Sequence, residues 1–475
     1  MSYKNLRAFI AELEAAGQLH RVKAQVDWDV EIGAITRELF RRKHGPAVVF
    51  ENVKDSRFPL FTGTMFGAEK YARMIDVEPP TVQAITRRLV EAIDKIIPPV
   101  IVQQGACQEN VLLGDDIDLG IFPSPRWFHM DGGRFIGTLG CVVTRDPETS
   151  IRNVAVYRGQ VLGRNRIGVN CEQHGGLHLR KYRDLGKPMP VAFSIGTPPA
   201  VLLGAAAKVP FGVDEYFVAG GLAGEPIPLV KCKTIDLEVP ADSEIVLEGY
   251  IAPDSAEWDL EGPFGEFHGH FNDLIPRKRP TAVLTAITYR DGAILQGCSP
   301  GVGPNEVTFS GQVGFAAGLW DSLRKAGIPG VKAVNFPESG TGGLVAVVQL
   351  GRHFYRGNAQ AVMHHAFAVG HFPKICIVVD EDIDIYDDFM VQWAIATRVQ
   401  PHRDIMITPA NTWGCPLDPS IPLADRPMPR TTSSRMGIDA TKYFKEGTDF
   451  SPLIVDDDAT IRKVLGRWRE YGFKD

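Results

Sequence analysis

The stretch Glu261-Gly-Pro-Phe-Gly-Glu266 places two carboxylates five residues apart around a turn, and Phe267-His268-Gly269-His270 follows it directly. Glycine and proline let a chain bend sharply and let a ligand or another backbone come close. A strand-like run over 243–252 precedes the turn, which predicts that a sheet carries it. Two acids on a rigid scaffold can have their pKa values pushed apart, as proton transfer requires. The alternative is an acidic turn that only faces solvent.

A second group of polar residues lies upstream of this turn. Asn153 and Arg158 are again five residues apart, in a run that alternates like a strand. A strict two-residue period would put them on opposite faces, so they can serve one site only if the strand ends or bends, for example at Arg158-Gly159. His178 and Glu215 follow, and with the Asn153 amide they are ligand types suited to Mn²⁺, Mg²⁺ or a similar cation. The chain has no short metal signature such as HExxH or paired CxxC, and each residue alone could be structural.

The composition indicates a globular protein of two or three domains. The chain has 475 residues, of which 44% are hydrophobic and 23% charged. The net charge of −6 and the lack of a Lys/Arg-rich tract argue against a nucleic-acid partner. No apolar stretch approaches the roughly 18 residues that span a membrane, and the N-terminus lacks a signal-peptide core. The seven scattered cysteines argue against a disulfide framework, so we expect a cytoplasmic protein without a membrane partner.

Patterns along the chain change character near residues 110 and 305. Between about 110 and 300, alternating runs broken by Gly and Pro predict an antiparallel, barrel-like sheet, with a meander over 132–163 and a hairpin at 290–292. After 305, helical and strand-like segments alternate, as in an α/β layer. The predicted helices are 4–17, 30–43, 80–96, 305–326, 357–369 and 458–471, and the predicted strands include 48–50, 60–62, 343–350 and 375–379.

Taken together, these segments resemble the UbiD family of decarboxylases, which use prenylated flavin mononucleotide. The resemblance runs through nearly the whole chain in the right order, and both groups of polar residues above are part of it. The other segments that carry it are 6–10, 31–36, 214–221, 229–249, 379–385, 393–398 and 435–441.

The resemblance implies an α+β fold in three parts. These are a small N-terminal α/β region over 1–109, a central flavin-binding antiparallel split β-barrel over 110–304, and a C-terminal α/β dimerisation domain with a terminal helix over 305–475. Motion between the last two parts would open and close the active site, with the Gly- and Pro-rich run 299–304 as part of the hinge. A homodimer or a higher homo-oligomer is expected.

Carried over residue by residue, the resemblance implies a catalytic network of Arg158, Glu261 and Glu266. Glu266 takes the place of the acid that returns a proton to the product carbon. Glu261 pairs with Arg158, and this pair shapes the pocket for the cofactor and the substrate carboxylate. A guanidinium suits that role because it is planar, permanently charged and bidentate.

The resemblance also implies a cofactor site. Asn153, His178 and Glu215 match the ligands of a divalent metal, usually manganese, which holds the cofactor phosphate; K⁺ is a further expected cation. Arg435 occupies the position of a basic residue near that phosphate. The implied cofactor-binding residues are Asn153, Val154, Ala155, Val156, Tyr157, Arg158, Leu177, His178, Glu215 and Arg435.

The leading hypothesis is reversible, non-oxidative decarboxylation of an aromatic or heteroaromatic carboxylic acid, with CO₂ as co-product, through a covalent adduct with prenylated FMN. Loss of CO₂ from an sp² carbon leaves a carbanion that needs an electron sink, which a cofactor can supply. A separate flavin prenyltransferase would make the cofactor. Phe267, His268 and Gln296 are expected to line the substrate pocket, with Pro304 and Asn305 near them. His268 could bond a ring N–H or hydroxyl.

Three alternatives remain open from the sequence. The substrate could be an α,β-unsaturated acid of the acrylic type. The chain could be a plain-flavin oxidoreductase on the same scaffold, although it has no Rossmann glycine fingerprint for a nicotinamide partner. It could also be a non-catalytic subunit of a complex, although such a subunit need not keep all three residues of the implied network.

Overall fold

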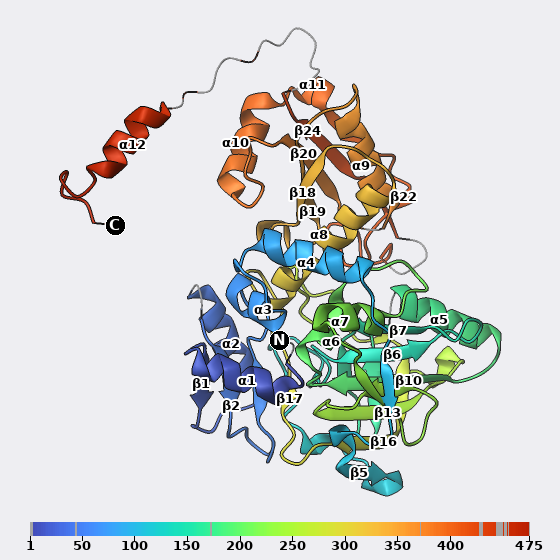
Figure 1. Ribbon diagram of the computed structural model, residues 1–475. Coiled ribbons are helices and arrows are strands. Elements are labelled where there is room, and N and C mark those ends of the chain that lie inside the picture. The colour runs from blue at the N-terminus through green and yellow to red at the C-terminus, as the bar shows by residue number, and fades with distance from the viewer. Residues whose placement is uncertain are drawn as a thin grey trace.

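The computed structural model describes residues 3–42, 45–171, 173–370, 372–426, 431–442, 450, 454 and 456–474. The N-terminal region and a curled central sheet form one body, and an α/β layer forms a second (Figure 1). Helices α4 (Val82–Asp94) and α8 (Glu306–Lys325) pack together where the two bodies meet. The predicted α+β fold class is confirmed.

The N-terminal region contains a small mixed sheet with the strand order β1-β2-β3-β17. β3 pairs in parallel with β17, which lies more than two hundred residues further along the chain. The predicted hairpin at 290–292 is therefore wrong, because the chain leaves the central sheet there and joins this one. The elements are α1 (Leu6–Ala15), β1 (Leu19–Val22), α2 (Glu31–Arg41), β2 (Ala47–Phe50), β3 (Leu60–Thr62), α3 (Ala68–Met74) and β17 (Leu295–Gln296).

The central sheet is antiparallel throughout its described strands and has the order β7-β6-β10-β13-β16-β9-β8, with β5 also paired to β16. β7 and β8 follow each other in sequence but lie at opposite ends of this order. The sheet is therefore curled, and the predicted meander is correct for β6 and β7 but wrong for β8. The strands are β5 (Asn110–Leu113), β6 (Cys141–Arg145), β7 (Arg152–Val156), β8 (Gly159–Val161), β9 (Arg166–Val169), β10 (Met189–Ile195), β13 (Ile245–Ile251) and β16 (Thr281–Tyr289).

Helices pack against the end of the curled sheet that includes β7. α6 and α7 are apolar almost all round and nearly every residue in them is buried, so they carry no amphipathic period that a sequence pattern could reveal. The remaining elements are α5 (Gln173–Asp184), α6 (Pro199–Ala206), α7 (Glu215–Ala223), β4 (Val100–Val102), β11 (Pro228–Lys231), β12 (Glu238–Pro240), β14 (Leu260–Glu261) and β15 (Arg277–Lys278).

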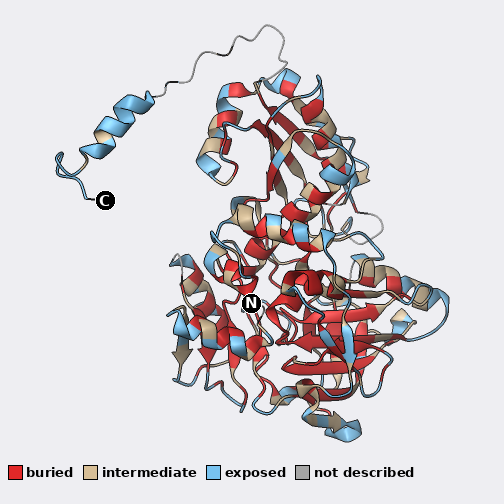
Figure 2. Cartoon of the chain, viewed as in Figure 1, coloured by how far each residue is buried: buried red, intermediate tan, exposed pale blue. Residues whose placement is uncertain are grey.

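The C-terminal body is a sheet of order β18-β19-β20-β24-β21 covered by helices. β19, β20 and β24 are parallel, as the predicted α/β alternation requires. α12 lies apart from both bodies and is exposed along most of its length (Figures 1 and 2). The elements are β18 (Val331–Asn335), β19 (Val345–Leu350), α9 (Asn358–Ala368), β20 (Ile375–Asp380), α10 (Asp388–Arg398), α11 (Pro401–Asp404), β21 (Ile405–Ile407), β22 (Thr412–Trp413), β23 (Thr432–Ser433), β24 (Met436–Ala440) and α12 (Asp458–Gly466).

Buried residues concentrate along both sheets and at the junction between the two bodies (Figure 2). None of the helices in the described ranges has the length and apolarity that a membrane crossing needs. At the junction, Glu306 begins α8 and is fully buried. Its carboxylate accepts hydrogen bonds from the Met65 N–H at 3.0 Å and from the Thr62 hydroxyl at 3.2 Å. The start of the C-terminal domain is therefore attached to a loop of the N-terminal region.

The stability that Glu306 contributes at this junction should depend on pH. Burial raises the pKa of Glu306 to about 7, although the hydrogen bonds that it accepts oppose the shift. Between its ordinary pKa of 4.5 and pH 7, the folded chain therefore binds more protons than the unfolded chain, so stability falls as the pH rises. We expect Glu306→Gln to flatten this dependence, measured as the melting temperature at about pH 5 and about pH 8. The exposed Glu225→Gln is the control, and equal pH dependence in wild type and Glu306→Gln would contradict the assignment.

Candidate active site

Arg158 lies at the centre of a buried ion-pair network between the two ends of the curled sheet. β7 ends at Val156 and β8 begins at Gly159, so Arg158 sits in the short connection between them. The strand thus ends between Asn153 and Arg158, as one shared site requires. The Arg158 Nε donates to Glu261 Oε1 at 2.8 Å and Nη2 donates to Glu261 Oε2 at 3.1 Å. Nη1 donates to Glu266, so the three residues of the implied network meet.

The two carboxylates of this network differ in their surroundings. Glu261 has 0% exposure and Glu266 has 8%. Burial alone would raise the pKa of Glu261, but the charge and hydrogen bonds of Arg158, together with the Arg279 charge, outweigh it and hold the pKa below its ordinary value. Glu261 is therefore an anion at neutral pH that fixes the guanidinium through two bonds. The Glu266 N–H donates to the His270 carbonyl at 3.0 Å, which links this acid to the segment that follows the turn.

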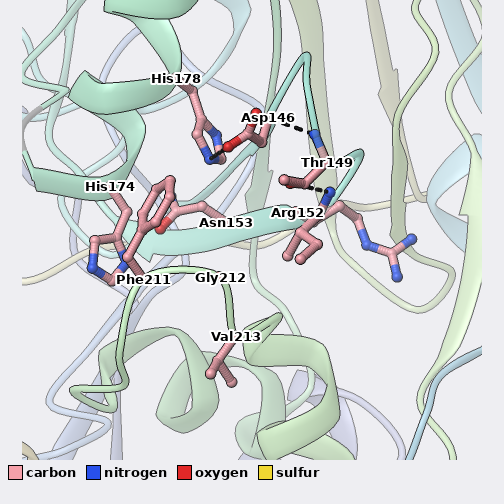
Figure 3. A pocket seen from close by; sticks show the side chains of 10 residues that line it. Asp146, Thr149, Arg152, Asn153, His174, His178, Phe211, Gly212 and Val213 are labelled. Carbon is pink, nitrogen blue, oxygen red and sulfur yellow. Dashed lines mark hydrogen bonds and ion pairs between the residues drawn. The ribbon is translucent and has the colours of Figure 1, made fainter.

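A small pocket lies between β7, α5 and the loop before α7 (Figure 3). Asn153 and His178 both line it, as does Asp146. The His178 Nδ1 lies 2.9 Å from the Thr144 hydroxyl, and its Nε2 lies 4.0 Å from Asp146 Oδ2. Burial lowers the pKa of His178 to about 4, with Asp146 opposing the shift, so the imidazole is neutral at pH 7. A neutral imidazole is the form that binds a metal.

Two of the three residues predicted to bind the metal face this pocket. The buried Asn153 Nδ2 has no hydrogen-bond partner among the described residues. Glu215 begins α7, and its Oε2 accepts from the Val154 N–H at 2.6 Å; burial raises its pKa to about 8. An amide, a neutral imidazole and a buried carboxylate are donors that fit a divalent cation. No cluster of three or more His, Cys, Asp and Glu in the described ranges could hold a metal, so the manganese site stays a prediction.

The remaining residues predicted to bind the cofactor fall into two groups. Ala155 and Val156 are half-buried on β7 with Asn153, and Leu177 is half-buried on α5 beside His178. Tyr157 is half-buried in the connection between β7 and β8. Arg435 is in the C-terminal body, where its guanidinium donates to the carbonyls of Phe367 at 3.0 Å, Gly370 at 2.7 Å and Trp413. Ten described residues line the pocket, and Arg435 is not one of them.

The residues predicted to line the substrate pocket lie on two segments. His268 directly follows the turn and is 7% exposed; its Nδ1 accepts from the His270 N–H at 3.2 Å. Its Nε2 has no partner among the described residues. Phe267 is half-buried, with its ring centroid 5.4 Å from that of His268. Gln296 lies on β17 and donates to the Thr64 hydroxyl at 2.9 Å, so it also attaches the N-terminal region.

Sequence reasoning missed two side chains that contact the backbone of the turn. Asp131 accepts from the Gly265 N–H, and Gln160 accepts from the Gly262 N–H. An isolated Asp before Gly132-Gly133 reads as an ordinary loop residue, and Gln160 reads as one polar residue of a short strand. The pairing depends on tertiary contacts, because each partner is more than one hundred residues away.

Comparison with known proteins agrees with this architecture. Three family models match: 3-octaprenyl-4-hydroxybenzoate carboxy-lyase N-terminal domain at 10–93, Rift-related domain at 100–303 and C-terminal domain at 309–440. Vanillic acid decarboxylase of Sedimentibacter hydroxybenzoicus in its closed form is 32% identical, with a TM-score of 0.89 and all of both chains covered. The evolved dimeric form of HmfF from Pelotomaculum thermopropionicum, in complex with prenylated FMN, is 30% identical, with a TM-score of 0.82 over 96% of this chain and 98% of that one.

A third solved structure widens this set. The 3,4-dihydroxybenzoic acid decarboxylase of Enterobacter cloacae is 26% identical, with a TM-score of 0.80 over 98% of this chain and 100% of that chain. The fold and the matched models define a carboxy-lyase, an enzyme that removes or adds CO₂. The chain belongs to the UbiD family. It is more similar to the closed form of the vanillic acid enzyme than to the open form, for which the TM-score is 0.84.

Proposed function

We propose that this carboxy-lyase catalyses the reversible, non-oxidative decarboxylation of an aromatic or heteroaromatic carboxylic acid. The observation that carries the proposal is the buried network of Arg158 with Glu261 and Glu266. A guanidinium beside two acids can orient a substrate carboxylate and support proton transfer. Relatives named for vanillic and 3,4-dihydroxybenzoic acids support an aromatic substrate.

The cofactor in this proposal is prenylated FMN, which the HmfF relative holds. When bound, it supplies the electron sink for the electrons that CO₂ leaves behind. Asn153, His178 and Glu215 would hold a divalent metal, manganese by the family resemblance, against the cofactor phosphate. The neutral His178 imidazole, which lines the same pocket as Asn153, supports this assignment.

The chain's own residues then have separate tasks. Arg158 orients the substrate carboxylate, and the anionic Glu261 keeps the guanidinium in place through two hydrogen bonds. After the C–C bond breaks and CO₂ departs, the protonated Glu266 transfers its proton to the carbon that carried the carboxylate. Glu266 suits that task because, of the two acids, it is the one not fully buried. In the carboxylation direction, Glu266 removes the same proton.

One experiment tests the function. The chain is co-expressed with a flavin prenyltransferase, and the bound cofactor is identified by mass spectrometry while the metal is measured by elemental analysis. We expect prenylated flavin, a divalent metal, and CO₂ release from at least one acid in a panel of hydroxybenzoic and heteroaromatic acids. Activity on acrylic-type acids alone would correct the substrate class. Plain flavin with redox turnover, or an empty protein, would overturn the proposal.

His268 should contribute to substrate recognition. Its buried Nε2 has no partner among the described residues, and it lies two positions after Glu266. Because one neutral hydrogen bond contributes about 1 kcal/mol, we expect His268→Phe to raise KM about fivefold for substrates with a ring acceptor. The control is His270→Phe, since His270 is exposed and its backbone N–H is retained. Unchanged KM values across the acid panel would remove His268 from the pocket.

A further inference from the structure

A buried carboxylate holds the C-terminal end of the turn that carries Glu261 and Glu266. Asp131 is 5% exposed and accepts three backbone N–H groups. Its Oδ1 accepts from Gly265 at 2.9 Å, and its Oδ2 accepts from Trp127 at 3.1 Å and from Phe128 at 2.9 Å. Gly265 directly precedes Glu266, so Asp131 attaches the backbone beside this acid to the 127–131 segment.

A different side chain holds the N-terminal end of the same turn. Gln160 is buried on β8, two residues after Arg158, and its Oε1 accepts from the Gly262 N–H at 2.6 Å. Between the two ends, the Gly132 N–H donates to the Pro263 carbonyl at 2.8 Å. The approach is so close that a Cβ on Gly132 would lie 1.9 Å from the Gly262 carbonyl oxygen. Groups outside the turn therefore hold it at Gly262, Pro263 and Gly265.

We infer that Asp131 is a positioning residue that sets the place of Glu266 relative to Arg158. This inference rests on the proposed function for its effect on catalysis. A carboxylate has acceptor sites for all three N–H groups, whereas asparagine offers one oxygen and turns an NH₂ donor toward the others. Burial raises the pKa of Asp131 to about 6, and the three N–H groups and the Arg158 charge oppose the shift. These N–H groups stabilise the ionised Asp131 carboxylate, which supports a role for this anion in holding the turn in place.

The test compares Asp131→Asn with a matched carboxylate elsewhere. Glu248 is also a buried carboxylate and also accepts backbone N–H groups, from Lys233 at 2.9 Å and from Thr234 at 2.8 Å. Because displacement of a reacting group by about 1 Å can cost about 100-fold in rate, we expect Asp131→Asn to lower kcat about 10- to 100-fold. KM and flavin content should stay close to wild type. Glu248→Gln should lower the melting temperature by as much as Asp131→Asn does, but it should keep the wild-type kcat.

A second readout does not need activity. Hydrogen–deuterium exchange of the Gly265 amide should be faster in Asp131→Asn than in wild type and unchanged in Glu248→Gln. Equal kcat in the two variants, or unchanged exchange at Gly265, would overturn the inference. If Asp131→Asn does not fold, Gln160→Met tests the N-terminal end of the same turn. Its kcat is measured in the same way, and amide exchange is followed at Gly262. A wild type that binds prenylated flavin without any turnover would refute the proposed function alone.

Discussion

Glu266→Gln is expected to lower kcat by about two to four orders of magnitude, because general acid–base catalysis typically contributes that much. Glutamine keeps the size of the side chain and can still accept from the Arg158 Nη1, but it has no transferable carboxyl proton. Flavin should stay bound, since Asn153, His178 and Glu215, which we propose hold the metal against the cofactor phosphate, are unchanged. The measurement is CO₂ release under saturating substrate, normalised to the flavin content of each preparation.

The control for this variant is Glu248→Gln, another buried acid changed to its amide. It separates the loss of a proton donor from the general effect of removing a buried charge. Incorporation of solvent deuterium into the product adds a second readout. In D₂O, wild type should place deuterium on the carbon that loses CO₂, and Glu266→Gln should do so far more slowly. Full turnover by Glu266→Gln would end the proton-donor assignment.

Arg158→Met is expected to lower the free energy of unfolding by about 3–5 kcal/mol and to abolish turnover, because it leaves the fully buried Glu261 without its main partner. The hydrophobic double variant Arg158→Met/Glu261→Met should recover much of the stability without recovering activity. Denaturant unfolding, followed by circular dichroism, measures the first effect. A double variant no more stable than Arg158→Met would contradict the buried-pair account.

The loss of stability in Arg158→Met should depend on pH. The pKa of Glu261 is held below its ordinary value of 4.5, so the folded chain binds fewer protons than the unfolded chain as the pH falls toward that range. The ion pair therefore contributes fully above about pH 5, and its contribution declines as the pH falls through the folded pKa. The stability difference between wild type and Arg158→Met should shrink in acid. A constant difference would show that Glu261 is not the group left unpaired.

The family resemblance named Arg158, Glu261 and Glu266, and local sequence patterns predicted the turn and the strand end that bring them together. Gly and Pro around the two acids predicted a tight turn, and the mismatch between a two-residue period and the spacing of Asn153 and Arg158 required the strand break that the structure has at 157–158. These features are local, so sequence patterns record them. The amphipathic helices of the N-terminal region were predicted for the same reason.

The features that were missed depend on long-range contacts or on burial. The pairing of β17 with β3 and the contact of Asp131 with Gly265 each join segments more than one hundred residues apart, and alternation does not specify a distant partner. α6 and α7 have no polar face that would mark them as helices. The role of Arg435 stays a prediction, and in the structure its guanidinium donates to three carbonyls of its own domain.

The curled sheet has a consequence for how the enzyme matures. Arg158 meets Glu261 and Glu266 only across separations of 103 and 108 residues, and β7 and β8 are at opposite ends of the strand order. Contacts of such long sequence separation form late and slowly during folding. A nascent chain on the ribosome therefore cannot assemble the network until Glu266 has left the exit tunnel.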